Sequence, residues 1–273
     1  MYPYTYKGLK KYLGVAKISV ASIFQYRLNF AIGRVRDLIL LLTLYYLWKT
    51  VFGSSQSLFG YTLTAMFTYV IASHLARSAI LLTNTTNIAS EITGGSKFFA
   101  YLVRPISYLK YWFTVDLVHK LVELVAAFVE VAIIVKLFKI SLIFQTNPGL
   151  IFATMIAVVL AVILNFYLGY LVALFAFWTP QAWGPRFLFD LLLSFAAGAF
   201  FPLDVFGPKI AAFFSALPFY YLLFFPVNVY LGRIEPINIF TGLLITLVWV
   251  GILSTMTQFV WKAGLRTYEG GGI

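Results

Sequence analysis

The sequence predicts an all-α membrane protein with six transmembrane helices. Of its 273 residues, 62% are hydrophobic and only 11% are charged, and the mean hydropathy is +0.91. Soluble domains are about 45–50% apolar and about 25% charged, so no soluble fold could hide this much apolar surface. Two further observations support this class. The apolar residues form runs about as long as a bilayer is thick, and lysines and arginines gather at the ends of these runs.

The first expected element is a helix over residues 7–28 that lies in the membrane surface. Apolar residues recur there at helical spacing, at Leu9, Leu13, Ala16, Val20, Ile23 and Phe24. Lys10, Lys11 and Lys17 occupy other positions on the helical wheel, as is typical of an interfacial helix. A solvated basic arm without fixed structure is the alternative. No compact apolar core with a small-residue cleavage site is present, so we expect insertion without cleavage.

Six apolar runs are the expected membrane spans, since a helix needs about 20 residues to cross the bilayer. The fourth and sixth contain no charge, the third is unusually polar, and the fifth is short. The runs are residues 30–52, 58–82, 108–137, 150–178, 187–201 and 237–261. We expect residues 1–273 to form a single transmembrane domain without an appended soluble domain.

Residues 203–232 are expected to re-enter the membrane from its outer side without crossing it. The stretch from 210 to 232 is apolar enough to span, but Pro218 and Pro226 each lack a backbone donor and favour a break. Broken helices at membrane depth are tolerated where they pack against protein or line a cavity. Together with the short fifth run, this predicts re-entrant outer helices between spans five and six.

The charges predict a multi-pass protein of the plasma or inner membrane with both termini in the cytoplasm. Lysines and arginines precede the first run, and Lys262 and Arg266 follow the last, as the positive-inside rule requires for six crossings. The net charge of +11 is explained by anionic headgroups, and we expect no nucleic-acid partner. Lys136 and Lys139 fall on the outer side and are exceptions to the rule.

Residues 83–107 then form the largest cytoplasmic loop. The loop starts with the turn-forming "TNTTN", continues to Gly94 and Gly95, where the backbone can bend sharply, and ends with an amphipathic "KFFAYLVRP". This predicts a short helix across the membrane surface whose polar residues, Glu91 and Lys97 among them, face a soluble partner.

Two motifs resemble the ABC-2 type permease family. The loop sequence "YLVRPIS" matches an L-x-R-P-x-S signature of a bacterial branch, with Arg104 and Pro105 at its centre. The outer segment "SFAAGAFFPLDVFGPK", with "LPF" and "PVNVYLG" after it, is similar to the fifth span and re-entrant helices of the family. Gly207 departs from this pattern, which has a proline or a hydrophobic residue at that position.

The resemblance implies the permease subunit of an ATP-driven exporter or flippase for an amphipathic or hydrophobic molecule. Its partners would be cytoplasmic ABC ATPase subunits, a second permease chain, identical or related, and membrane lipid. ATP and Mg²⁺ would bind the ATPase, because this chain lacks a G-x-x-x-x-G-K-[ST] loop and is expected to have no cofactor and no catalytic residues. The residues of the ATPase-coupling loop would be Glu91, Gly94, Gly95, Lys97, Arg104 and Pro105.

The third run carries charges that admit a second interpretation. Asp116 and Lys120 are four residues apart, as are His119 and Glu123, so each pair can meet on one helix face. We interpret these four as paired, partly hydrated groups at headgroup level. Charges inside a membrane suggest function by default, so the alternative is a relay that reaches Glu130.

On that alternative, the protein is a proton-coupled secondary carrier that uses Glu123 and Glu130. Such carriers often contain two similar halves, and no internal repeat is visible here. His74 and Arg77 are expected to anchor the second span at the interface. Two separated histidines without any cysteine do not predict a metal site.

Overall fold

The computed structural model describes residues 4–103, 106–179 and 183–268. These residues are mostly helical, which confirms the all-α class. The α-helices are α1 (Tyr4–Gln25), α2 (Arg27–Phe52), α3 (Leu63–Ile80), α4 (Thr86–Gly94), α5 (Ser96–Leu102), α6 (Tyr108–Phe138), α7 (Pro148–Leu174), α8 (Trp183–Ala196), α9 (Pro208–Ser215), α10 (Phe224–Tyr230) and α11 (Pro236–Thr267). Short 3₁₀ turns are η1 (Phe175–Phe177), η2 (Leu203–Phe206) and η3 (Pro218–Tyr221), and the strands are β1 (Ser57–Leu58) and β2 (Tyr61–Thr62).

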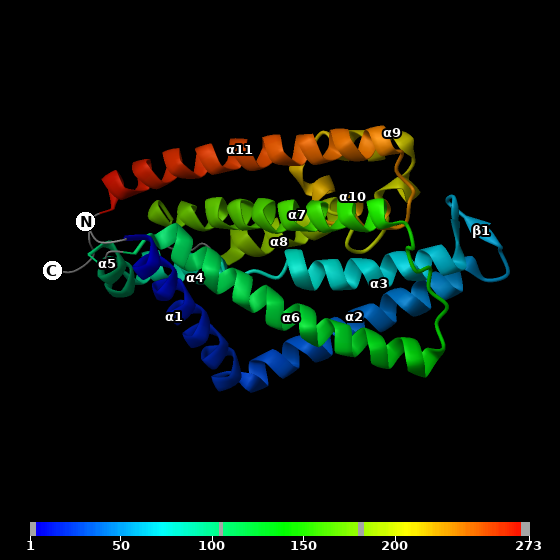
Figure 1. Cartoon of the computed structure of the whole chain (residues 1–273), viewed down its shortest axis with the longest axis horizontal. Coiled ribbons are helices and arrows are strands. Elements are labelled where there is room, and N and C mark those ends of the chain that lie inside the picture. Colours follow the sequence, from blue (N-terminus) through cyan, green and yellow to red (C-terminus); the bar gives the residue numbers. More distant parts are fainter. Residues whose placement is uncertain (1–3, 104–105, 180–182, 269–273) are drawn as a thin grey trace.

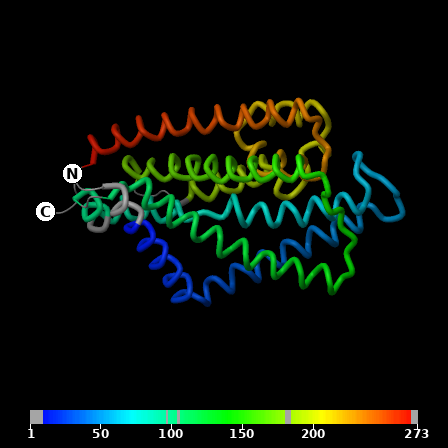
Figure 2. The backbone as a smooth tube through the Cα atoms, in the orientation of Figure 1, coloured from blue at the N-terminus to red at the C-terminus, as the bar shows by residue number. Residues whose placement is uncertain are grey.

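The long helices run between two ends of an elongated molecule (Figure 1). We call the end that holds α4 and α5 the loop end, and the opposite end, with β1 and β2, the hairpin end. The chain runs toward the hairpin end in α2, α6 and α8 and returns in α3, α7 and α11 (Figure 2). The start of α1 and the end of α11 therefore both lie at the loop end.

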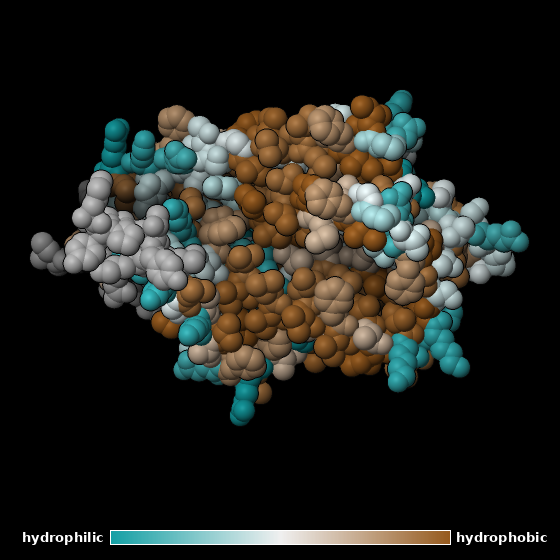
Figure 3. Space-filling view, in the orientation of Figure 1, coloured by the Kyte–Doolittle hydropathy of each residue, from teal (hydrophilic) through white to brown (hydrophobic). Residues whose placement is uncertain are grey.

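Apolar residues cover the middle of the molecule, and hydrophilic residues gather at both ends (Figure 3). By length and composition, the helices Pro148–Phe177 and Pro236–Thr267 can each cross a membrane. The helices α2 and α6 have comparable lengths of 26 and 31 residues but carry charged side chains, and α8 has only 14 residues. The apolar middle and these two long apolar helices establish a membrane protein.

A β-hairpin precedes α3, so the second long helix begins at Leu63 and not at residue 58 as expected. The hairpin pairs Ser57 with Thr62, and its two turn residues, Phe59 and Gly60, both have positive φ. Such a turn matches the twist of two antiparallel strands. The Thr62 hydroxyl then accepts a hydrogen bond from the backbone N–H of Ala65 and so caps the start of α3.

The helix of the fifth run ends at Ala196, before the predicted limit of residue 201. The chain turns at Gly198, which has a φ of +80°. A Cβ there would lie 2.9 Å from the hydroxyl of Tyr69, which donates a 2.8 Å hydrogen bond to the Gly198 carbonyl. The helix ends close to the point where the Tyr69 hydroxyl, on α3, binds the backbone carbonyl of Gly198.

The outer segment is bent as predicted, but not at both prolines. The pair formed by Pro208–Ser215 and Pro218–Tyr230 is bent by 91°, with the break just before Pro218. The predicted break at Pro226 is wrong, because this residue lies in the first turn of α10, where a helix does not need the missing donor. Gly207 begins α9 with a φ of +97°, a conformation that favours glycine, so its departure from the family pattern has a structural cause.

Candidate functional site

A polar cavity of about 800 Å³ lies in the loop-end half of the molecule, between α1, α2, the residues before α4, and α6. Serines of α1 and the turn-forming residues before α4 supply much of its wall. Its charged and titratable lining residues are Arg34, Arg36, Asp37, Glu91, His119 and Glu123. A cavity with these polar and charged lining residues suits water or the polar part of a ligand, whereas the apolar surface over the middle of the molecule suits lipid.

A buried charge cluster stands at the inner wall of this cavity. Arg34 of α2 pairs with Asp37 on its own helix, with Glu123 of α6 at 3.0 Å, and with Glu130 of α6 at 3.5 Å. His74 of α3 completes the cluster, with its Nε2 atom 3.2 Å from Glu130. Three long helices are thereby joined by charge inside the apolar body. We call these five residues the charge cluster.

The charge cluster corrects one expectation and adds two residues. His74 is 8% exposed and binds Glu130, so its predicted role as an interface anchor is wrong. Arg34 and Asp37 were not singled out from the sequence, because nothing local to α2 indicates its neighbours on α6. The available signal was their position inside an apolar run, where a charge needs a partner.

Several polar atoms of this region have no hydrogen-bond partner among the described residues. They include Nε and Nη1 of Arg34, Nδ1 of His119 and Oε2 of Glu123. The pairs of Arg34 with Asp37 and of His74 with Glu130 are hydrogen-bonded, whereas the pairs of Arg34 with Glu123 and Glu130 bring the charges close without an aligned hydrogen bond. A buried polar group left unsatisfied costs about 1–3 kcal/mol. Water or a polar ligand in the cavity would therefore be stabilised at this wall.

The two predicted helix pairs of α6 form, but in a drier setting than expected. Lys120 donates to Asp116 at 2.5 Å, and Nδ1 of His119 lies 3.8 Å from Glu123. Asp116 and Lys120 are 1% and 2% exposed, so the predicted partial hydration of this pair is wrong, whereas Glu123 lines the polar cavity. The connection between α3 and α4 contacts Asp116 through Thr83 and Asn84.

Asp116 also holds that connection against α6. Its Oδ1 accepts a 2.6 Å hydrogen bond from the Thr83 hydroxyl and a 2.8 Å bond from the backbone N–H of Asn84. With Lys120 on its other oxygen, the carboxylate is bound on both sides. These bonds hold the start of the predicted coupling loop against α6 at Asp116, midway along the half of the helix that is nearer the loop end.

The predicted coupling loop consists of two short helices joined at Gly95. This residue has a φ of +72° and ends α4 just before α5 begins. The bend belongs to Gly95 alone, because Gly94 is the last residue of α4 and has no positive φ. Lys97 lies in α5, but its side chain is outside the described part of the chain. Arg104 and Pro105 also lie outside the described residues.

Phe98 anchors this loop to the ends of three long helices. Its side chain is fully buried. Its ring contacts Tyr108 at the start of α6, Phe177 after α7, and Trp261 and Tyr268 at the end of α11, with centroid distances of 5.3, 5.6, 5.9 and 5.0 Å. Aromatic pairs contribute about 0.5–1.5 kcal/mol each beyond their area. Phe98 therefore packs α5 directly against α6, η1 and α11.

Glu91 points toward α6, although we expected it to face a soluble partner. The Tyr108 hydroxyl donates a 3.1 Å hydrogen bond to its Oε2, and Glu91 lines the polar cavity. The two residues are 17 positions apart, so no helical spacing could have indicated the contact. Glu91 orders the loop against the start of α6.

A second polar cluster closes the hairpin end. The guanidinium of Arg233 lies 3.6 Å from the ring centroid of Tyr61, and its Nη2 is 3.1 Å from Asp204. The Tyr61 hydroxyl donates to Asp204 at 3.0 Å. Burial, with Asp204 beside it, raises the pKa of Tyr61, so the phenol stays neutral and keeps donating. The sequence did not single out these residues.

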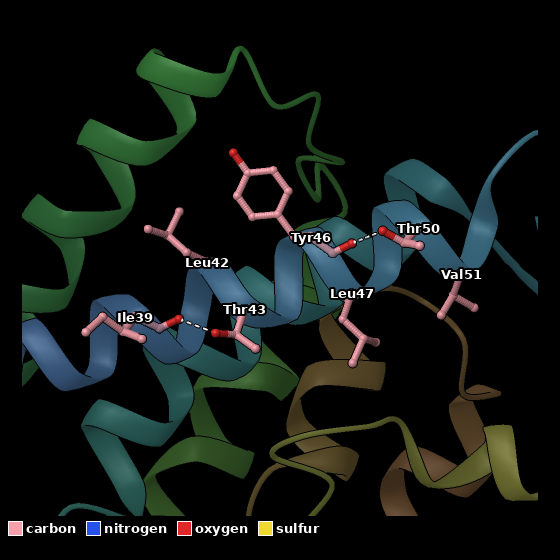
Figure 4. A pocket seen from close by; sticks show the side chains of 7 residues that line it. All are labelled: Ile39, Leu42, Thr43, Tyr46, Leu47, Thr50 and Val51. Atoms are coloured by element: carbon pink, nitrogen blue, oxygen red, sulfur yellow. Dashed lines mark hydrogen bonds between the residues drawn. The ribbon is translucent and has the colours of Figure 1, made fainter.

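The exposed face of α2 carries a shallow hollow that contains no polar site (Figure 4). Seven side chains of this one helix form it, from Ile39 to Val51. The hydroxyls of Thr43 and Thr50 donate to the backbone carbonyls of Ile39 and Tyr46, one turn earlier. Because both threonine hydroxyls are satisfied and the other lining side chains are aliphatic or Tyr46, the face suits contact with lipid or with another apolar helix.

Comparison with protein families matches residues 38–272 to the model of the ABC-2 family transporter proteins. The match covers α3 to α11 and most of α2, whereas α1 and the three charged α2 residues of the polar cavity wall, Arg34, Arg36 and Asp37, precede it. No curated protein and no solved structure that was compared matches this chain.

Proposed function

Because this chain belongs to the ABC-2 family of transporter proteins, we propose that it is the membrane-spanning permease subunit of an ATP-driven exporter or flippase. Its cargo is an amphipathic or hydrophobic molecule. The observation that supports this most is the loop-end assembly, in which two short helices are wedged against three long ones by Phe98. Such an assembly can receive a push from outside the membrane and pass it inward.

The proposal includes six crossings of the plasma or inner membrane, by α2, α3, α6, α7, α8 and α11. The loop end faces the cytoplasm with both termini, and α1 lies in the interface. In support, α1 starts and α11 ends at the same end of the molecule (Figure 1), where Lys262 and Arg266 also lie. The segment from α9 to α10, bent by 91°, re-enters from the other side.

A separate ATPase would dock on α4 and α5 and bind ATP and Mg²⁺. The coupling residues of the proposal are Glu91, Gly94, Gly95, Lys97, Arg104 and Pro105. Within the described set, Gly95 sets the angle between the two helices, and Glu91 holds α4 to the start of α6. Closure of the ATPases would move this loop and shift the long helices between inward and outward states.

The polar cavity would receive the polar part of the cargo, and a second permease chain would complete the route. Five buried polar atoms of cavity-lining residues have no hydrogen-bond partner among the described residues, so they could bind the polar part of a ligand. The second chain would pack against an apolar helix face, and the exposed face of α2 is a candidate. The apolar part of the cargo would follow the boundary between the two chains.

The experiment is purification of the tagged chain from its native membrane, followed by reconstitution in vesicles. An ABC ATPase should copurify with it, and transport should require ATP hydrolysis by that subunit. A variant of the ATPase that binds but does not hydrolyse ATP should stop transport. Transport by the purified chain alone, without ATP, would overturn the proposal.

One observation favours the carrier as a second candidate function. Two glutamates of α6 each lie next to a histidine: Glu123 near His119, and Glu130 near His74. The second pair joins α6 to α3 and could pass a proton between these two helices. The carrier requires that an imposed proton gradient drive transport without ATP, and this arm of the same vesicle experiment separates the two functions.

A further inference from the structure

An apolar cavity of about 550 Å³ lies in the hairpin-end half of the molecule, separate from the polar cavity. Its walls come from α3, α6, the connection to α7, α7 itself and α10. Three of its lining side chains carry hydroxyls, and the others are aliphatic, proline or phenylalanine. The volume is within the range of about 300–1,000 Å³ that is typical of small-molecule sites.

The three hydroxyls are all engaged within the protein. Thr68 donates to the carbonyl of Thr64 at 2.8 Å and accepts the backbone N–H of Ile143 at 2.9 Å. Thr154 donates to a backbone carbonyl one turn earlier, and Tyr230 accepts a backbone N–H from the connection before α7. A polar ligand would lose its hydration here without gaining partners. The cavity therefore selects an apolar occupant.

The mouth of the cavity lies on the apolar surface. Of its lining residues, Phe128 is 54% exposed and Phe144 is 75% exposed. Ala132, between them on the rim, is also exposed. A groove that opens into the hydrocarbon region is accessible to the chains of membrane lipids without passing through the polar cavity.

Two lysines stand beside this mouth at the end of α6. Lys136 directly follows the lining residue Val135, and Lys139 caps the helix in a left-handed conformation with a φ of +50°. Both are exposed, and neither forms an ion pair within the described residues. They are two of the positive charges at the hairpin end, where the positive-inside rule favours fewer. Basic residues near the membrane surface attract anionic headgroups by about 1 kcal/mol each, or about thirtyfold in affinity for two charges.

We propose that this cavity holds one acyl chain of an anionic phospholipid whose phosphate lies between Lys136 and Lys139. The apolar walls take the chain, and the lysines take the headgroup. This would account for two of the positive charges at the hairpin end. The inference depends on the membrane location of the chain and not on its transport activity.

The test is native mass spectrometry of the purified chain, with phosphatidylglycerol and phosphatidylcholine as probes. We expect one tightly retained phosphatidylglycerol per chain and weaker retention of phosphatidylcholine. Ala132→Trp blocks the mouth from an exposed position and should remove most of the retained lipid of both kinds. Ala72→Phe fills the interior and should do the same.

The charge arm uses a matched control. Lys136→Gln with Lys139→Gln should weaken phosphatidylglycerol binding on the order of thirtyfold and leave phosphatidylcholine binding unchanged. Lys49→Gln with Lys209→Gln also removes two exposed lysines from the hairpin end but should change neither lipid. Equal loss in both double variants, or full retention in Ala132→Trp, would overturn the proposal. Stoichiometric displacement of the lipid by transported cargo would also overturn it and assign the cavity to cargo.

Discussion

The guanidinium of Arg34 lies 3.0 Å from the carboxylate of Glu123, and both side chains are buried in the body of a membrane protein. The contact joins α2 to α6, and the neighbouring Glu130 brings α3 into the same cluster through His74. A buried cation surrounded by three carboxylates is a strong constraint, because removing it leaves negative charges without compensation.

Arg34→Gln is therefore expected to destabilise the protein by about 3–5 kcal/mol, the cost of breaking a buried ion pair. Thermal unfolding in detergent measures the change. The control is Arg36→Gln, because the Arg36 side chain is 69% exposed and also contacts Asp37, and exposed pairs contribute about 0–1 kcal/mol. Equal destabilisation by the two variants would show that the cluster is not the constraint inferred here.

Glu130→Gln separates the two candidate functions. Glutamine keeps the shape and most of the hydrogen bonding toward His74 and Arg34, so an ATP-driven permease should retain most of its transport. A proton-coupled carrier should lose transport entirely, because the glutamine amide cannot take up a proton near neutral pH. The measurement is uptake into vesicles with and without a proton gradient, at a fixed ATP concentration.

Gly95→Val is expected to uncouple the complex, because valine resists the φ of +72° that the bend requires. ATPase copurification and cargo-stimulated ATP hydrolysis should both fall, whereas membrane insertion should survive. Gly94→Val is the matched control: a Cβ at Gly94 would meet no atom within 4 Å, and its φ is not positive. Normal coupling in Gly95→Val would mean that the loop is merely a connection.

Phe98→Ala is expected to loosen the loop from α6, η1 and α11, at a cost of about 3–5 kcal/mol for a buried phenylalanine. The ATPase should then hydrolyse ATP with little transport. Phe99→Ala offers a control at the next position, because that ring is 58% exposed. ATP hydrolysis and cargo movement, assayed together in vesicles, give the ratio. An unchanged ratio in Phe98→Ala contradicts the role of this ring in transmission.

Orientation can be measured with single cysteines, since the chain has none. Thr267→Cys, at the end of α11, should react with a membrane-impermeant maleimide only when the cytoplasmic side is opened. Ser55→Cys, before the hairpin, should react from outside in intact cells. Labelling of Thr267→Cys from outside alone would contradict the six-span arrangement.

Local patterns in the sequence were enough to predict the long helices and a bend at Gly94 and Gly95, which the structure narrows to Gly95. The expected run 108–137 and the helix Tyr108–Phe138 differ by one residue, because apolar composition and the capping Ser107 are local signals. The end of α8 was misplaced, since it depends on the Tyr69 hydroxyl, 129 residues away from Gly198.

The charge cluster could be predicted only in part for the same reason. The i,i+4 pairs of α6 follow from spacing within one helix, whereas the contacts of Glu130 with Arg34 and His74 depend on how three helices pack. Pro226 shows why a proline alone does not predict a helix break. The effect of a proline depends on its place in the helix, and α10 starts two residues before Pro226.

The bonds of Asp116 to Thr83 and Asn84 give α6 a fulcrum. At 1.5 Å per residue, the helix extends about 12 Å from Asp116 toward Tyr108 and about 33 Å toward Phe138. Phe98 presses on the short arm, at Tyr108. On the proposed coupling mechanism, a rigid helix held at this point would act as a lever, and a small displacement of the loop would become a displacement more than twice as large at the far end of α6.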